Sequence, residues 1–282
     1  KRLNAMLEQG ITTVESKSGY GLDLKTELKQ LNVMKALSEH QPVTIIPTYM
    51  GPHSIPKEYS SSEQYIEYII QNVLPQIKQQ GIANFADIFC EKGVFEIPET
   101  RRYLEAAQEI GFPLKLHADE IYALGGTGLG VDYHAVSVDH LLKASQSDIA
   151  KLAQSETVAT LLPLTAFVLK EPFAPGRAMI DAGCAVALAS DFNPGSCYSQ
   201  SIPLIIALAV LYMGLSIEET LTALTLNGAA ACGIADSYGS LEPGKKADFI
   251  VLDAPDYRYL AYNTGMNIVH SVYKHGQIVH KR

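Results

Sequence analysis

Histidine and carboxylate side chains follow several short apolar runs in this sequence. His117 and Glu120 come directly after the run Leu114–Leu116, and His140 and Asp191 come after two later runs of the same kind. Imidazole and carboxylate groups are common protein ligands of zinc and of non-haem iron. Such an ion lowers the pKa of a bound water to about 7 and so makes hydroxide available at neutral pH. The pattern therefore predicts a metal-assisted hydrolytic site.

Each of these side chains has a role that its chemistry suggests. Asp191 would bind the metal and accept a proton, and His117 would be a second ligand. His140 would orient the water or stabilise developing charge, and it is also the candidate for a third ligand. Glu120 would lie over the substrate as a hydrogen-bond partner or proton shuttle. Because a catalytic site normally has three protein ligands and one open position, we expect further ligands from elsewhere.

The same residue types also have ordinary structural uses. His53, in the sequence G-P-H-S-I-P, could shape a turn, and His140 could be a buried structural histidine. Asp191 could be an Asx-turn residue, because it precedes N-P-G. The joint occurrence of these side chains after successive runs favours the functional interpretation. Four further polar side chains stand at comparable positions: Tyr20, His53, Asn193 and Ser196.

The runs that precede these residues have the composition of buried strands. A helical stretch follows each run, and strands that alternate with helices at this spacing form a parallel sheet. The carboxyl ends of parallel barrel strands lie at one mouth, so the residues after them come together there. The seven runs are Ile11–Glu15, Val43–Tyr49, Ala86–Cys90, Leu114–Leu116, Ala135–Val138, Thr157–Leu162 and Ala185–Ala189.

Seven β/α units are one short of the eight that a closed barrel needs. The sequence also opens inside a helical stretch at Lys1, so we predict a TIM-like (β/α)8 barrel that lacks its first strand in this chain. An open doubly wound sheet is the rival fold, and it usually carries a G-x-G-x-x-G fingerprint that opens a helix. The stretch Gly125–Gly130 is rich in glycine but has a different spacing, which predicts a loop with at most a short helix.

The strand–helix alternation ends after Gly239. The segment L-E-P-G-K-K-A-D-F-I-V-L-D predicts a turn and a strand, and Val269–Tyr273 with Ile278–His280 predicts a hairpin. We therefore expect residues 1–238 to form the barrel, with its strands 2–8, and residues 239–282 to form a small β appendage.

Composition narrows the range of partners. The net charge of −8 argues against nucleic acid and anionic membranes, and a small-molecule substrate is expected. The four cysteines are widely spaced, which is typical of reduced thiols in a cytoplasmic protein. The longest apolar run, Ile202–Met213, is too short to span a bilayer and predicts a buried helix. That helix is also compatible with the interface of a homodimer.

The motifs around these residues resemble the amidohydrolase superfamily. A histidine after the fifth barrel strand, a histidine after the sixth and an aspartate after the eighth make up the shared pattern. The segment G-S-L-E-P-G-K-K-A-D-F-I-V-L-D is similar to the superfamily's C-terminal sandwich signature, which implies that 239–282 is part of a composite β-sandwich domain. More narrowly, five motifs in order resemble the imidazolonepropionase family: E-S-K-S-G-Y-G-L, T-Y-M-G-P-H-S-I-P, D-I-F-C-E-K-G-V-F, K-L-H-A-D-E and S-D-F-N-P-G-S.

This resemblance implies hydrolysis of 4-imidazolone-5-propanoate to N-formimidoyl-L-glutamate in histidine degradation, with one zinc or iron ion. It implies that His117 and Asp191 bind the metal and that His140 helps to activate the water. The family's other ligands, an H-x-H pair on the first strand, and the arginine after them are absent here. The resemblance therefore implies an N-terminally truncated chain that is inactive alone. The implied substrate contacts are Tyr20, His53, Glu120, Asn193, Gly195 and Ser196.

Two other functions are compatible with part of the pattern. A deaminase of the same superfamily would act on a purine-type or pyrimidine-type ring, and the spacing His117-x-x-Glu120 also suits such enzymes. Release of ammonia would distinguish it. A non-catalytic scaffold would have lost its ligands, whereas every ligand position that is present here keeps a competent residue. The metal content of the full-length protein would test that alternative.

Overall fold

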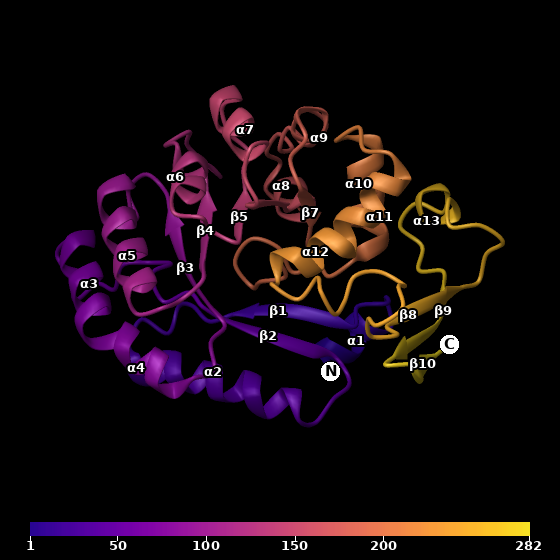
Figure 1. Ribbon diagram of the computed structural model, residues 1–282, viewed down its shortest axis with the longest axis horizontal. Helices are drawn as coiled ribbons and strands as arrows, with labels where there is room; N and C mark the ends of the chain where they lie inside the picture. The colour runs from indigo at the N-terminus through magenta and orange to yellow at the C-terminus, as the bar shows by residue number, and fades with distance from the viewer. The chain divides into compact units, whose positions relative to one another are not determined.

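The computed structural model describes all of residues 1–282, which form two compact units (Figure 1). We call Val14–Thr157 the central unit, and Lys1–Thr13 together with Val158–Arg282 the terminal unit. Strands alternate with helices in both, which confirms the predicted α/β class. This division does not test the predicted boundary after residue 238, which stays a prediction.

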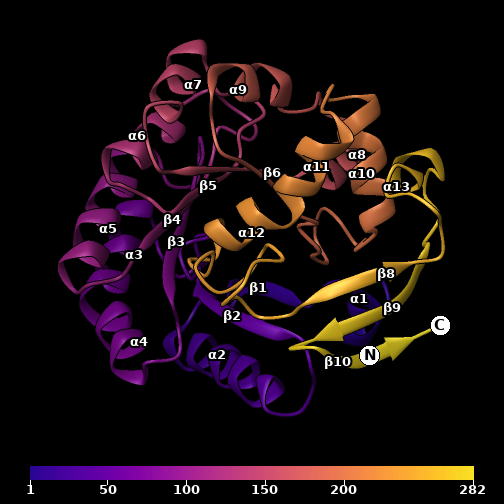
Figure 2. The same cartoon turned by 45° about the vertical axis from the view of Figure 1, so that its right-hand side comes forward.

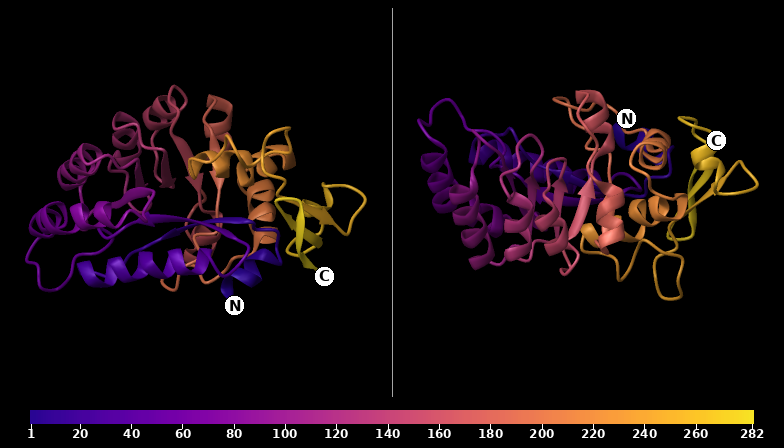
Figure 3. Two further views of the ribbon diagram at one scale, coloured as in Figure 1. Left: turned by 60° about the horizontal axis from the view of Figure 1, so that its bottom comes forward. Right: turned by 90° about the horizontal axis from the view of Figure 1, so that it is seen from above.

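The central unit contains a parallel sheet whose strand order follows the sequence, β1-β2-β3-β4-β5. Helices α2, α5 and α6 pack against its strands (Figure 3). The elements are β1 (Thr13–Lys17), α2 (Leu24–Ser38), β2 (Thr44–Tyr49), α3 (Ser62–Tyr68), the π-helix η1 (Ile69–Val73), α4 (Leu74–Gln80), β3 (Phe85–Cys90), α5 (Ile97–Glu109), β4 (Leu114–Ala118), α6 (Gly126–Asp132), β5 (Ser137–His140) and α7 (Gln146–Leu152).

Local sequence explains where these elements lie. Strands β3 and β4 are buried along almost their whole length, as expected for parallel strands that are covered on both faces. Helix α5 buries Tyr103, Leu104 and Ala107, which share one side of the helix. Helix α7 begins with a capping box between Ser145 and Asp148, which satisfies two backbone N–H groups that the helix leaves open.

The glycine-rich stretch forms helix α6, where the sequence had predicted a loop with at most a short helix. The absence of side chains lets this helix lie very close to the sheet. A Cβ atom at Gly130 would stand 2.5 Å from Val138, and one at Gly126 would stand 3.0 Å from the Ala118 Cβ. The glycines therefore allow helix α6 to pack closely on β4 and β5.

The terminal unit combines two parallel strands, several helices and a separate antiparallel sheet of order β10-β9-β8 (Figure 2). Its elements are α1 (Arg2–Leu7), β6 (Val158–Leu161), α8 (Pro163–Leu169), α9 (Gly176–Ala182), β7 (Val186–Leu188), α10 (Ile202–Leu211), α11 (Ile217–Leu224), α12 (Leu226–Ala231), β8 (Phe249–Leu252), α13 (Tyr259–Tyr262), β9 (Val269–Lys274) and β10 (Gln277–Lys281).

Most expected elements of this unit are confirmed, including the hairpin of β9 and β10 and the buried helix α10. Two short helices, α8 and α13, were not expected. Helices α11 and α12 are separated at Thr225, whose φ and ψ of −118° and −83° leave the helical region. The four cysteines form no disulfide, and no helix of the chain is long and apolar enough to cross a bilayer.

The capping box of α11 gives a test of this unit. The Ser216 side chain accepts a hydrogen bond from the Glu219 N–H, and Glu219 bonds back to the Ser216 N–H. We expect Ser216→Ala to lower the free energy of unfolding by about 1 kcal/mol in chemical denaturation, because this cap is lost. Ser237→Ala, at an exposed position away from any helix start, is the control and should change stability by less than about 0.5 kcal/mol. Equal effects of the two changes would contradict the cap.

Candidate metal and catalytic site

Strand register places charged side chains side by side within the central unit. Asp87 of β3 pairs with Lys115 of β4, and two residues further along, His117 of β4 pairs with Asp139 of β5. Because side chains alternate between faces of a strand, residues two apart share a face. The register therefore gathers ionisable groups on one face of the parallel sheet.

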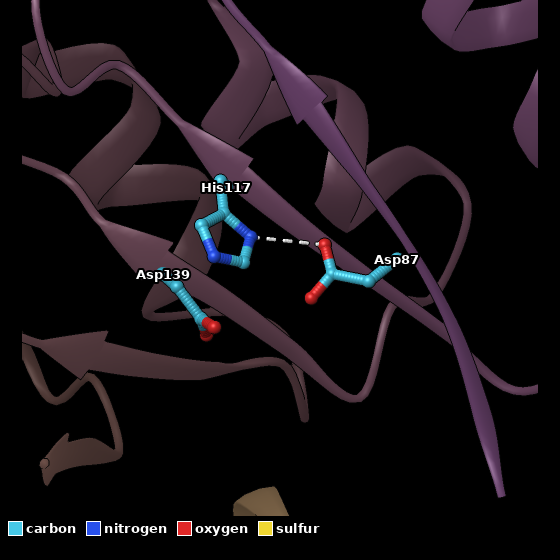
Figure 4. Close-up of side chains that lie close together, drawn as sticks. All are labelled: Asp87, His117 and Asp139. Carbon is cyan, nitrogen blue, oxygen red and sulfur yellow. Dashed lines mark hydrogen bonds and ion pairs between the residues drawn. The ribbon is translucent and has the colours of Figure 1, made fainter. Parts of the chain in front are cut away.

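Asp87, His117 and Asp139 form a buried cluster that could hold a metal ion (Figure 4). One ligand atom from each residue lies within 4.8 Å of the others. The His117 Nδ1 atom is 3.0 Å from the Asp87 Oδ1 atom, and this contact is the dashed line in Figure 4. Imidazole and carboxylate groups are the donors that zinc and iron accept. The donor types therefore suit a metal ion, and the cation beside Asp87 and Asp139 decides which of the three residues is available as a ligand.

The Lys17 ammonium supplies positive charge beside the same carboxylates. Its Nζ atom lies 2.5 Å from Asp87 and 2.9 Å from Asp139. Burial alone would lower the pKa of Lys17, but the charges of Asp139 and Asp87 together hold it well above its ordinary value. Burial would likewise raise the pKa of each carboxyl group, but the cations beside them hold both pKa values low. Lys17 is thus charged and neutralises acids that burial would otherwise penalise.

The bond from Asp87 also fixes the orientation of His117. Burial alone would lower the pKa of the His117 imidazole, but the Asp87 carboxylate raises it to about 9. With Nδ1 held by Asp87, Nε2 is the ring nitrogen left for a metal. Histidine ligands commonly donate the other N–H to a carboxylate in this way, which fixes the ring and strengthens the ligand. Asp87 therefore has the geometry of such an orienting group.

Removal of Lys17 tests the charge balance. We expect Lys17→Met to lower the free energy of unfolding by about 3–5 kcal/mol, because it leaves Asp87 and Asp139 buried without their cation. Adding Asp139→Asn should restore part of the loss. Chemical denaturation measures all of these values. Lys25→Met, at an exposed position on α2, is the control, and an equal effect of the two lysine changes would show that the network contributes no stability.

A row of rings continues from His117 across the ends of the strands. The His53 ring stacks on Phe89 at a centroid distance of 5.1 Å and meets the His117 ring edge-on at 5.9 Å. The Tyr20 ring lies 4.6 Å from His53, and the His140 ring lies 5.3 Å from His117. The structure thus brings together four of the predicted site residues.

Glu120 joins this row through His140. Its Oε1 atom is 3.5 Å from the His140 Nδ1 atom, and its side chain is mostly buried. A carboxylate beside an imidazole can hold or transfer a proton. The arrangement therefore has the parts of a general acid–base site next to a candidate metal ligand.

Several strand-end residues adopt left-handed backbone conformations. Tyr20, Asp119, His140 and Asp191 have φ values of 53°, 50°, 80° and 47°. Such conformations are uncommon for residues other than glycine, and they are frequent at functional sites. All four lie at or next to positions that the sequence had singled out.

The loop that carries Tyr20 is fixed by two side chains of α2. The Gln30 amide accepts a bond from the Gly19 N–H at 3.0 Å and donates one to the Gly19 carbonyl at 3.1 Å. The Glu27 carboxylate accepts from the Gly21 N–H at 2.9 Å and is buried. Burial raises the pKa of Glu27, and hydrogen bonds to its carboxylate only partly offset this.

The raised pKa of Glu27 predicts a pH effect. A carboxyl group whose pKa is higher in the folded state stabilises the fold below its unfolded pKa, and this contribution is lost as pH rises through the folded value. The unmodified chain should therefore lose stability relative to Glu27→Gln between pH 4 and pH 7. The unfolding free energy of the variant minus that of the unmodified chain should rise over this range. Denaturation at several pH values measures it. A constant or decreasing difference would contradict the assignment.

The other predicted residues lie together in one loop of the terminal unit. The Asp191 Oδ2 atom accepts a hydrogen bond from the Thr165 hydroxyl at 2.6 Å. The Asn193 Oδ1 atom accepts from the N–H groups of Gly195 and Ser196 at 2.8 and 2.7 Å. Asn193, rather than Asp191, therefore makes the Asx-type turn that shapes this loop.

Sequence reasoning missed the charged residues inside the strands. Asp87 and Lys115 each stand between two apolar residues, Glu15 and Lys17 lie in β1, and the buried Lys115 ammonium lies 2.9 Å from the Glu15 carboxylate. The signal that could have found them is a charged residue within an otherwise buried strand, since such residues are seldom buried unless paired. Asp119 has a structural role: its carboxylate accepts four hydrogen bonds, from the N–H groups of Leu124, Gly125 and Thr127 and from the Thr127 hydroxyl.

Known proteins resemble this sequence over nearly its whole length. The sequence pattern of the amidohydrolase family matches residues 1–280. The chain is 53% identical over 283 residues to an imidazolonepropionase from Clostridium tetani, covering 100% of this chain and 68% of that protein. It is 55% identical over 281 residues to an imidazolonepropionase from Bacteroides thetaiotaomicron, covering 99% and 67%. The chain thus spans about two thirds of the length of these relatives.

Solved structures of low sequence identity share the fold. A triazine hydrolase variant matches with a TM-score of 0.77 and 18% identity, covering 99% of this chain and 70% of that one. An adenosine deaminase from Xanthomonas campestris with bound zinc matches with a TM-score of 0.73 and 18% identity, covering 98% and 67%. At this identity the likeness extends to the fold alone.

Proposed function

The chain belongs to the amidohydrolase family and, within it, to the imidazolonepropionases, and from this we propose that the protein hydrolyses 4-imidazolone-5-propanoate to N-formimidoyl-L-glutamate. The identity of 53–55% to such enzymes over nearly the whole chain is the observation that carries the proposal. The row of imidazole rings beside a buried glutamate in the central unit supports it.

We propose that His117 is a ligand of a zinc or iron ion and that Asp191, which matches the family pattern, is also a metal ligand. The donor set suits such an ion, and the Asp87 bond to Nδ1 directs the Nε2 atom of His117 to this use. The ion, when bound, would supply a water of lowered pKa and polarise the ring carbonyl. The two ligands belong to different units, so their roles rest on chemistry and family pattern.

The remaining steps fall to side chains of this protein. Asp191 accepts the proton of the attacking water and transfers it to the leaving ring nitrogen. His140 helps to activate the water, and with His53 it stabilises the negative charge that develops on the carbonyl oxygen. Glu120 holds the ring N–H. Further substrate contacts are made by Tyr20, Asn193, Gly195 and Ser196. Of these, Tyr20 and Ser196 help to bind the propionate.

Product analysis tests the proposed reaction. The full-length protein that carries this chain, supplied with zinc or iron, should convert the imidazolone to N-formimidoyl-L-glutamate without release of ammonia. Ammonia release from purine-type or pyrimidine-type rings, in place of this reaction, would instead identify a deaminase. Absence of both activities and of bound metal would point to a scaffold.

The role of Asp191 has its own test. We expect Asp191→Asn in the full-length protein to lower kcat by about 10²–10⁴-fold, because the amide cannot accept the proton. The free energy of unfolding should change little, since the amide oxygen can still accept the Thr165 hydroxyl bond. Asp236→Asn, at an exposed position, is the control. Near-normal turnover of the Asp191 variant would remove this residue from the mechanism.

A further inference from the structure

Glu120 lies in a loop that has little apolar anchoring of its own. The next two side chains, Ile121 and Tyr122, are 56% and 49% exposed. Hydrophobic burial therefore contributes little to holding this part of the loop in place. The position of Glu120 must depend on other contacts.

Two buried carboxylates bind the backbone that follows Glu120. The Glu91 Oε2 atom accepts from the N–H groups of Ile121 and Tyr122, the next two residues, at 2.9 and 3.4 Å. Asp119, the residue before Glu120, accepts from the N–H groups of Leu124, Gly125 and Thr127 at 2.8–2.9 Å. Asp119 and Glu91 are 0% and 1% exposed, so both act away from water.

Glu91 reaches this loop from the neighbouring strand. It directly follows β3, and its N–H donates to the Phe95 carbonyl at 2.9 Å. Its Oε1 atom accepts from the Lys92 N–H at 2.7 Å. The Lys92 ammonium also lies 4.8 Å from the centre of the Tyr122 ring, a second contact between the two loops. The loop after β4 is thus tied to the loop after β3.

We propose that Glu91 is a positioning residue that holds Glu120 in place for the reaction. This inference rests on the proposed function. Both oxygens of Glu91 receive N–H donors, so a carboxylate is required: an amide would put its own NH₂ group against a backbone N–H. A small displacement of a group that must meet the substrate can cost about 10²-fold in rate. Glu91 itself reaches only backbone groups and acts through Glu120.

A double-mutant cycle in the full-length enzyme tests this role. We expect Glu91→Gln to lower kcat/KM for the imidazolone by roughly 10–100-fold. In a Glu120→Gln background the same change should lower it by less than about threefold, since the group that it positions is already gone. A general structural role would give the full loss in both backgrounds and overturn the proposal, as would unchanged kinetics.

The control is Glu96→Gln, which should leave kcat/KM unchanged in both backgrounds. Glu96 belongs to the same β3–α5 connection and accepts a bond from the Gly93 N–H at 3.2 Å, but it is exposed and does not contact the Glu120 loop. This control changes a backbone acceptor in the same connection but keeps the bonds that Glu91 accepts from Ile121 and Tyr122.

Hydrogen exchange of the unmodified protein gives a measurement that needs no variant. The Ile121 and Tyr122 amides should be protected, despite their exposed side chains, because Glu91 accepts both bonds. Exchange at the unprotected rate would overturn the proposal whether or not Glu91→Gln folds. If the unmodified protein fails to hydrolyse the imidazolone, the proposed function fails, and this exchange alone decides whether Glu91 holds the loop.

Discussion

The buried contact of the Lys17 ammonium with Asp87 and Asp139, at 2.5 and 2.9 Å, is the interaction on which the site depends. These two carboxylates, on the strands β3 and β5 that flank β4, could not remain ionised in this interior without a cation, because desolvation of an unpaired charge is very costly. With Lys17 present, both stay charged. Asp87 can then hold the Nδ1 atom of His117. The orientation of this candidate metal ligand therefore depends on the charge balance between Lys17 and the two carboxylates.

The candidate site residues of the central unit lie at or just after strand ends. Tyr20 and His140 have left-handed backbones there, a conformation that needs support from the surrounding structure. That support is polar: side chains of α2 bind the Tyr20 loop, and buried acids bind the Glu120 loop. In the central unit, buried polar side chains of the scaffold therefore fix the backbone of the loops that carry the candidate site residues.

Much of the fold and of the candidate site could be predicted from the sequence. The features that could not be predicted depend on packing and strand register. Apolar runs and the residues after them located the seven strands, and chemistry at the strand ends singled out His117, His140 and Glu120. The sequence allowed a short helix at α6 but did not show why its glycines are there, because close packing on the strands, rather than helix propensity, decides their role. Lys17 and Asp87 escaped because their pairing depends on register between strands that lie 70 residues apart in the chain.

Anomalous diffraction from crystals of the metal-loaded, full-length protein tests whether Lys17 and Asp87 orient His117 for a metal. We expect an ion at about 2.0–2.1 Å from the His117 Nε2 atom, with the Nδ1 atom still bonded to Asp87 and the Lys17 ammonium still between Asp87 and Asp139. An ion bound between those two carboxylates in place of the ammonium would contradict it. In that case Asp87 would be a ligand, and Lys17 would not be the cation that orients His117.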